Sequence, residues 1–277
     1  METFSNTWKL MGASWDLLRK DKELLVFPLI SGICCLLILA SFASPIIMGG
    51  GMHSGGDPAH SAPFGYGSLF LFYFCSYFVI TFFNTAVVAC AAHRMSGGDP
   101  TVSYGLQEAF DRFNLIIGWA ALQATVGLIL RTIEDRSEWI GKIVAGLLGM
   151  AWTVTSFLVV PVMVLEKKGP LDAVKESASL LRKTWGEQLI GNFSFGLVFL
   201  ALAVPAFLLL AFGFMSGSGA GVLIAVTAAI LYIIGLILVQ SALQAIFQTA
   251  LYFYARDGKA PRGFENAGLE RAVAVKG

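Results

Sequence analysis

The sequence predicts an all-α, polytopic membrane protein with six transmembrane helices. They are expected to form three hairpins of the same orientation, each preceded by an amphipathic helix at the cytoplasmic membrane surface. Three observations favour this fold class. The chain is 56% hydrophobic and 13% charged, which is too apolar for a soluble globule of this size. It contains six long apolar runs. A short motif, in which a cation is followed by glycine and then proline, recurs after every second run.

Six apolar runs are long enough to cross a hydrocarbon core about 30 Å thick. They occupy residues 24–48, 66–92, 113–130, 143–165, 189–214 and 220–254. The last run would extend roughly 52 Å as one helix, so we expect it to tilt, kink or project beyond the membrane. A signal peptide is the competing interpretation of the first run. Its length and the acidic residues before it favour a retained helix.

The recurrent motif occupies residues 93–100, 167–170 and 256–261. Glycine can close a helix and proline prevents its continuation, so each copy predicts a helix end among positive charges. Before the first, third and fifth runs, apolar residues also recur at helical spacing. We therefore predict one membrane domain, 1–261, built from same-sense repeats at about 1–100, 101–170 and 171–261. Residues 262–277 would form a cytoplasmic tail. The alternative is that ordinary helix ends beside basic loops produce the same pattern.

The distribution of positive charge predicts the topology. Segments 1–23, 93–112, 166–187 and 255–277 hold 16 of the 19 lysines and arginines. Because basic residues accumulate on the cytoplasmic side, both termini are expected to be cytoplasmic. The expected location is a prokaryotic cytoplasmic (inner) membrane.

Polar side chains within the apolar runs are candidates for a polar path. Counted back from the motif prolines, four of them lie at one depth in the three repeats: Asn84, Thr153, Ser156 and Gln244. In the sixth run the polar side chains are spaced four residues apart, on one face of the helix. The candidates are Asn84, Thr153, Ser156, Gln240, Gln244 and Gln248. The alternative is that they only form hydrogen bonds between neighbouring helices.

The polar faces of the first and third amphipathic segments carry lysines and arginines. Such helices lie in the headgroup plane with the apolar side down. Anionic lipid headgroups are therefore expected to bind Lys9, Arg19, Lys20, Lys175, Arg182 and Lys183.

Several functional classes find little support in the sequence. No charged residue lies deep within a predicted span, which argues against a pump or proton antiporter. Glu166, beside two lysines, is interpreted as part of an interfacial ion pair. We find no catalytic motif and predict no enzymatic activity, no cofactor and no nucleic-acid partner. His53, Asp57 and His60 could share a metal, but their glycine-rich loop offers no fixed geometry, so no metal site is predicted.

Two functions remain open. The first is a conduit or carrier for a small neutral molecule or lipid along the polar path. The second is a nonconducting scaffold or accessory subunit that binds lipid or a partner protein. The expected partners are membrane lipids, with a partner membrane protein or a second copy of the chain as further possibilities.

One segment resembles a known group of proteins. It comprises the exit of the fourth run and the amphipathic segment after it: Glu166, Lys167, Lys168, Gly169, Pro170, Ala173, Glu176, Ser177, Leu180, Trp185 and Gly186. This pattern resembles uncharacterised prokaryotic six-helix membrane proteins related to the membrane domain attached to some glycerophosphodiester phosphodiesterases. The resemblance implies a six-helix fold and a connection to lipid. It transfers no catalytic residue, and this sequence contains no soluble phosphodiesterase domain.

Overall fold

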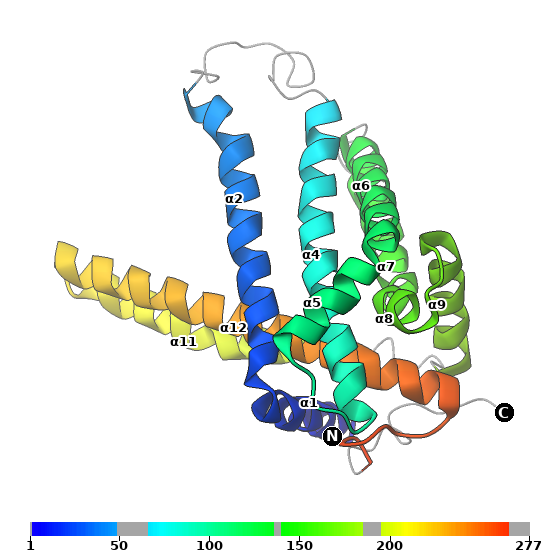
Figure 1. Ribbon diagram of the computed structural model, residues 1–277. Helices are drawn as coiled ribbons and strands as arrows, with labels where there is room; N and C mark the ends of the chain where they lie inside the picture. Colours follow the sequence, from blue (N-terminus) through cyan, green and yellow to red (C-terminus); the bar gives the residue numbers. More distant parts are fainter. Residues whose placement is uncertain (1, 49–65, 136–139, 185–194, 266–277) are drawn as a thin grey trace.

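The computed structural model describes residues 2–48, 66–135, 140–184 and 195–265, and these are almost entirely helical (Figure 1). Ten α-helices and one 3-10 helix are assigned in this part of the chain. In order they are α1 Glu2–Lys20, η1 Lys22–Leu25, α2 Val26–Met48, α4 Tyr66–Met95, α5 Val102–Asp111, α6 Phe113–Asp135, α7 Ile140–Thr155, α8 Val159–Glu166, α9 Pro170–Thr184, α11 Phe195–Met215 and α12 Gly219–Asp257.

Six helical segments are long and apolar enough to cross a membrane. They are Lys22–Ser44, Tyr66–Met95, Phe113–Asp135, Gly141–Glu166, Val198–Met215 and Gly219–Asp257. Each overlaps one of the six apolar runs, so the all-α class and the six candidate spans are confirmed. The fourth candidate span consists of α7 and α8 together.

The core forms around α4, which contacts α2, α5, α6, α8 and α12. The C-terminal half of α4 is rich in small side chains, and Ala86, Val88 and Ala91 are completely buried. Small residues let helix backbones approach closely in membrane bundles. The C-terminal half of α12 packs here as well, with Ile246 and Leu251 fully buried. Residues of both α4 and α12 therefore belong to the buried hydrophobic core.

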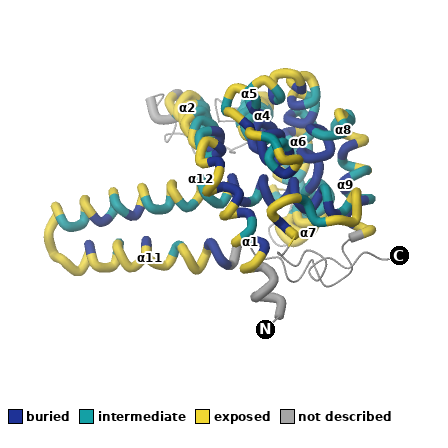
Figure 2. Tube along the Cα trace, turned by 60° about the horizontal axis from the view of Figure 1, so that its bottom comes forward, coloured by how far each residue is buried: buried dark blue, intermediate teal, exposed yellow. Residues whose placement is uncertain are grey.

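The α11–α12 pair leaves this core sideways. Its two helices lie along each other and project away from α2, α4 and α6 (Figures 1 and 2). The 39 residues of α12 form one continuous helix, about 58 Å long at 1.5 Å per residue. Its C-terminal half contacts α4, α8 and α9, and exposed and half-buried residues alternate along its projecting half (Figure 2). The α11–α12 pair therefore runs across the direction of α2, α4 and α6 (Figure 1).

The ends of α4, α8 and α12 show how the recurrent motif terminates helices. After α4, Gly97 has a φ of +94°, and its N–H donates to Arg94 O while Gly98 N–H donates to His93 O. This pair of bonds is the Schellman arrangement. Gly258 ends α12 in the left-handed conformation. At α8, however, Lys167 adopts it with a φ of 55°, and the glycine two residues later precedes the first residue of α9.

The fourth span is interrupted between Thr155 and Val159. Pro161 lies in the first turn of α8, where its ring and missing N–H prevent the helix from continuing backwards. The interruption leaves Leu158 N–H without a helical partner. It donates to Ser177 Oγ of α9 at 3.1 Å, and both residues are completely buried. A side chain from a neighbouring helix thus satisfies the freed backbone group, as broken helices at membrane depth require.

Replacing Ser177 with Ala is expected to lower the free energy of unfolding by about 2 kcal/mol, because Leu158 N–H would remain buried without an acceptor. Unfolding by SDS titration in mixed micelles would measure the change. Ser179→Ala, the same substitution on the same helix, is the matched control and should change stability by less than about 0.5 kcal/mol. Equal effects of the two substitutions would contradict a role for the Leu158–Ser177 bond.

Candidate functional site

A polar cavity of about 210 Å³ lies where α2, α4 and α12 meet. Its polar lining comprises Ser31 of α2, Asn84 of α4, and Ser241, Gln244 and Gln248 of α12. The cavity thus brings together Asn84 and Gln244, which the sequence placed at one depth in different repeats, and also Gln248, which follows Gln244 by one turn of α12. Its remaining lining residues are apolar, and no ionisable side chain lines it.

The helix geometry explains how the amides meet. Gln244 and Gln248 are one turn apart on α12 and project from nearly the same face. That part of α12 packs against α4, which carries Asn84. Gln248 is only 9% exposed. No side-chain hydrogen bond joins any of the three amides to another residue in the described part of the chain. Each amide offers two donors and one acceptor, so the cavity has hydrogen-bonding capacity that the protein does not use.

Three other predicted path residues lie elsewhere. Gln240 lines a separate cavity of about 230 Å³ with Phe199 and Leu200 of α11. Thr153 Oγ1 donates to Gly149 O at 2.8 Å, and Ser156 Oγ donates to Thr153 O at 3.4 Å. These hydroxyls bond to the backbone of their own helical segment, a common use of Ser and Thr.

The separation of Gln240 from Gln244 has a geometric cause. Gln240 lies about 6 Å further along the axis of α12 than Gln244, in the direction of the projecting arm. At Gln240 the helix has also reached the part of α12 that lies against α11. Gln240 and Gln244 therefore line two different cavities, although they belong to one row of glutamines in the sequence.

Ser31 and Ser241, which were not among the predicted path residues, complete the polar lining. Ser241 lies three residues before Gln244 and so shares its helix face, a signal that the spacing contained. Nothing local distinguishes Ser31 from other serines in apolar runs.

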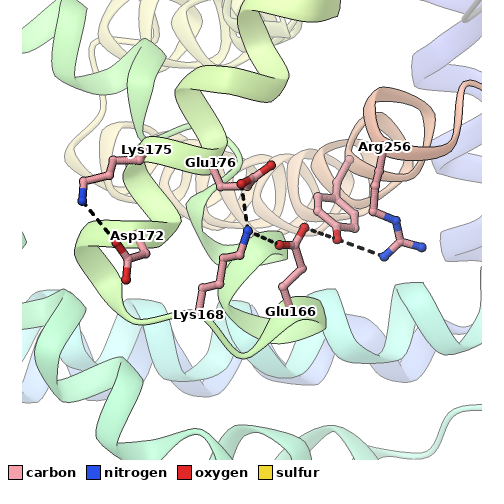
Figure 3. Close-up of polar contacts among 7 residues, drawn as sticks. Glu166, Lys168, Asp172, Lys175, Glu176 and Arg256 are labelled. Carbon is pink, nitrogen blue, oxygen red and sulfur yellow. Dashed lines mark hydrogen bonds and ion pairs between the residues drawn. The ribbon is translucent and has the colours of Figure 1, made fainter.

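A charged cluster joins the ends of α8, α9 and α12 (Figure 3). Lys168 Nζ lies 2.7 Å from Glu166 and 2.8 Å from Glu176, which confirms the ion pair expected at Glu166. Tyr252 donates to Glu166 at 2.7 Å, and Arg256 donates to the Tyr252 hydroxyl at 3.1 Å. Hydrogen bonds to Glu166, and then to Glu176, raise the pKa of Lys168 above its usual value. Since the charges compensate one another, this cluster fastens helices together.

The comparisons with known proteins place the chain in one family. The match is to a family described as a "Family of unknown function (DUF6159)", and it spans residues 64–263, well over half of the chain. The chain belongs to the DUF6159 family. No curated protein and no solved structure matches it.

The DUF6159 match runs from the start of α4 to beyond the end of α12, so it includes Asn84, Gln244 and Gln248. It begins after α2, and Ser31 therefore lies outside the matched region. The family description makes no link to phosphodiesterase-associated domains. That part of the sequence resemblance stays a prediction.

The predicted headgroup residues of this DUF6159 chain lie on α1 and α9. Lys175 pairs with Asp172 at 3.2 Å (Figure 3). The others are exposed and form no ion pair within the described residues: Lys9, Arg19, Lys20, Arg182 and Lys183.

Some predicted features fall in segments that the structure does not describe. His53, Asp57 and His60 lie outside the described residues, as do Trp185 and Gly186 of the resembling segment. Across residues 2–48, 66–135, 140–184 and 195–265, no group of three or more His, Cys, Asp or Glu side chains could hold a metal ion.

Proposed function

We propose that this protein is a membrane conduit or carrier for a small, uncharged, hydrogen-bonding solute. The observation that carries the proposal is the convergence of Asn84, Gln244 and Gln248 on one cavity with no side-chain partners among the described residues. Each of these amides keeps free donors and an acceptor facing the cavity. Water or a solute in the cavity would satisfy these groups.

The size and charge of the cavity support a solute of few heavy atoms. At about 210 Å³ it is smaller than the roughly 300–1,000 Å³ of drug-sized ligand pockets. A charged solute would need a compensating charge at this depth, and the lining residues supply none. We therefore propose neutral polar molecules as the solutes, and their passage requires no cofactor.

We also propose the part of the predicted membrane arrangement that the fold accommodates: an inner membrane protein with cytoplasmic termini and same-sense hairpins in the first two of three internal repeats, with the third pair, α11–α12, crossing them (Figure 1). The location of the positive charges supports it. Helix α1 and the C-terminal ends of α4 and α12 lie at one end of the molecule (Figure 1). Arg94 and Arg256 belong to those two helix ends, which suits the cytoplasmic side.

Solute flux tests the proposed function. Purified protein would be reconstituted in lipid vesicles, and the uptake of glycerol or urea would be followed by stopped-flow light scattering. Wild type is expected to accelerate the uptake of at least one of these probes over protein-free vesicles. The flux through the double variant Gln244→Leu, Gln248→Leu should be at least ten-fold lower than that of wild type, because the variant lacks two of the three amides in the cavity.

The chain provides a matched control on the same helix. Gln240→Leu makes the same change one turn earlier, in the separate cavity beside α11, and should retain the wild-type flux. A wild type no faster than protein-free vesicles for either probe, or a double variant with normal flux, would overturn the proposal.

A second candidate function is a scaffold or accessory subunit, and the projecting α11–α12 pair favours it. Phe207, Phe212 and Leu223 are between 63% and 75% exposed on this arm, which gives it a large apolar surface for another membrane protein or a second copy. Purification in mild detergent after crosslinking should then return a stoichiometric partner or a dimer. A lone, monodisperse protomer would contradict this function.

A further inference from the structure

A third cavity, of about 580 Å³, lies between α1 and the α11–α12 pair. Its volume falls within the roughly 300–1,000 Å³ of established ligand pockets. The walls are almost entirely apolar, with Trp8, Met11, Gly12 and Trp15 on α1 facing Phe199 of α11 and several residues of α12. It differs from the polar cavity in every lining residue.

Helix α1 has two apolar faces, and one of them lines this cavity. Leu10, Ser14 and Leu17 form a buried face against the core. Trp8 and Trp15 belong to a second apolar face, and they are 56% and 42% exposed. A surface helix ordinarily needs one apolar face to dock. The second face, which lines the cavity, is free to contact something that is not this chain.

Two glycines keep the cavity open. A Cβ atom added to Gly12 or to Gly235 would meet nothing within 4 Å, so neither glycine is needed for close packing. Glycine inside a helix costs about 1 kcal/mol relative to alanine. Tyr232, also in the wall, donates its hydroxyl to Leu202 O at 2.8 Å. The wall therefore suits an apolar occupant.

Arg19 does not line the cavity, but the register of α1 places it just beyond the cavity wall. Trp8, Gly12, Trp15 and Arg19 follow one another at intervals of four, three and four residues, so Arg19 continues the same helix face. It lies about 6 Å beyond Trp15 along the axis. Arg19 is exposed and has no ion-pair partner among the described residues. Tryptophan is enriched where hydrocarbon meets the headgroups, so the face runs from an apolar cavity to a headgroup-level charge.

We propose that this cavity is a binding site for one anionic phospholipid, with an acyl chain between α1 and the α11–α12 pair and the phosphate on Arg19. The bilayer that surrounds six apolar spans supplies this occupant at high concentration. An arginine fork matches phosphate oxygens geometrically. The site is independent of the solute cavity, and either assignment can fail without the other.

Native mass spectrometry of the full-length protein in mild detergent tests the cavity. The protein would be titrated with dioleoyl phosphatidylglycerol, and wild type is expected to retain one molecule with the highest affinity. Gly12→Leu and Gly235→Leu, made separately, each fill the cavity from a different wall and should weaken that first binding event at least ten-fold. Gly146→Leu on α7 is the matched control, since a Cβ there also meets nothing within 4 Å, and its binding should equal that of wild type. Wild-type affinity in both cavity variants would overturn the proposal.

A second titration tests the headgroup. Wild type should bind phosphatidylglycerol at least five-fold more tightly than phosphatidylcholine with the same acyl chains. Arg19→Gln should bring this ratio of affinities close to one. Arg262→Gln, at an exposed arginine after the end of α12 that is not among the predicted headgroup residues, should leave the ratio unchanged. Oleate, which has the chain without the phosphate, should bind more weakly than phosphatidylglycerol. A normal ratio in Arg19→Gln, or equal binding of oleate, would overturn the assignment to an anionic phospholipid.

Discussion

Replacing Arg112 with Met is expected to lower the free energy of unfolding by about 3–4 kcal/mol. Arg112 is 9% exposed and lies between α5 and α6. Its guanidinium donates to Val164 O at 2.7 Å and to Glu108 O at 2.9 Å, and it pairs with the Glu108 carboxylate. Methionine preserves much of the side-chain volume but leaves a buried carbonyl and a carboxylate without their donor, and losing one partner of a buried pair costs about 3–5 kcal/mol.

An exposed arginine provides the control for Arg112. Arg131→Met removes ion pairs to Glu134 and Asp135, at 3.8 and 3.3 Å, from a side chain that is 52% exposed. Solvent-exposed pairs contribute about 0–1 kcal/mol, so this variant should unfold close to wild type. SDS titration in mixed micelles would measure both. Similar losses for the two variants would show that Arg112 contributes no more than an exposed ion pair.

The second large effect is expected at Asp21, which lies between α1 and η1. Its two carboxylate oxygens accept from Arg94 Nε and Nη2, so the pair fastens the start of the chain to the end of α4. Asp21 is 8% exposed. Asp21→Asn leaves the guanidinium without its buried counter-charge and should cost about 3 kcal/mol.

The same arginine provides the comparison, because Arg94 also pairs with Asp99, which is 89% exposed. Asp99→Asn should cost less than about 1 kcal/mol, since solvent screens that contact. Thermal unfolding in detergent would rank the three proteins. An equal shift in melting temperature for Asp21→Asn and Asp99→Asn would refute the importance of burial at this arginine.

Much of the fold follows from elementary constraints that the sequence displays. Runs of apolar residues the length of a bilayer predict the spans, and the recurrent glycine–proline motif predicts their ends. The register counted from Pro100 and Pro261 places Asn84 and Gln244 at one depth, and the structure places both in one cavity. To infer this depth, only the rise per residue of an α-helix and a common reference point, the motif proline, are needed.

Other features depend on contacts between distant segments. The left-handed residue after α8 is Lys167, because glycine is favoured there but not required. Thr153 has the right depth, yet its hydroxyl is satisfied by its own helix. The sideways course of α11 and α12 has no signal in composition, since lipid-facing and protein-facing surfaces are both apolar. Hydrophobicity therefore predicts that these helices leave water without predicting their direction.

The polar cavity combines an early helix with the last one, and this fixes the order in which it is completed during synthesis. Asn84 and Gln244 are 160 residues apart. At about 5–20 residues per second, a ribosome would need roughly 8–32 s to make the intervening chain. For that interval a nascent polypeptide carries the asparagine of α4 without the glutamines of α12, and its amide must rely on water or a temporary neighbour. The site exists only once translation is nearly finished.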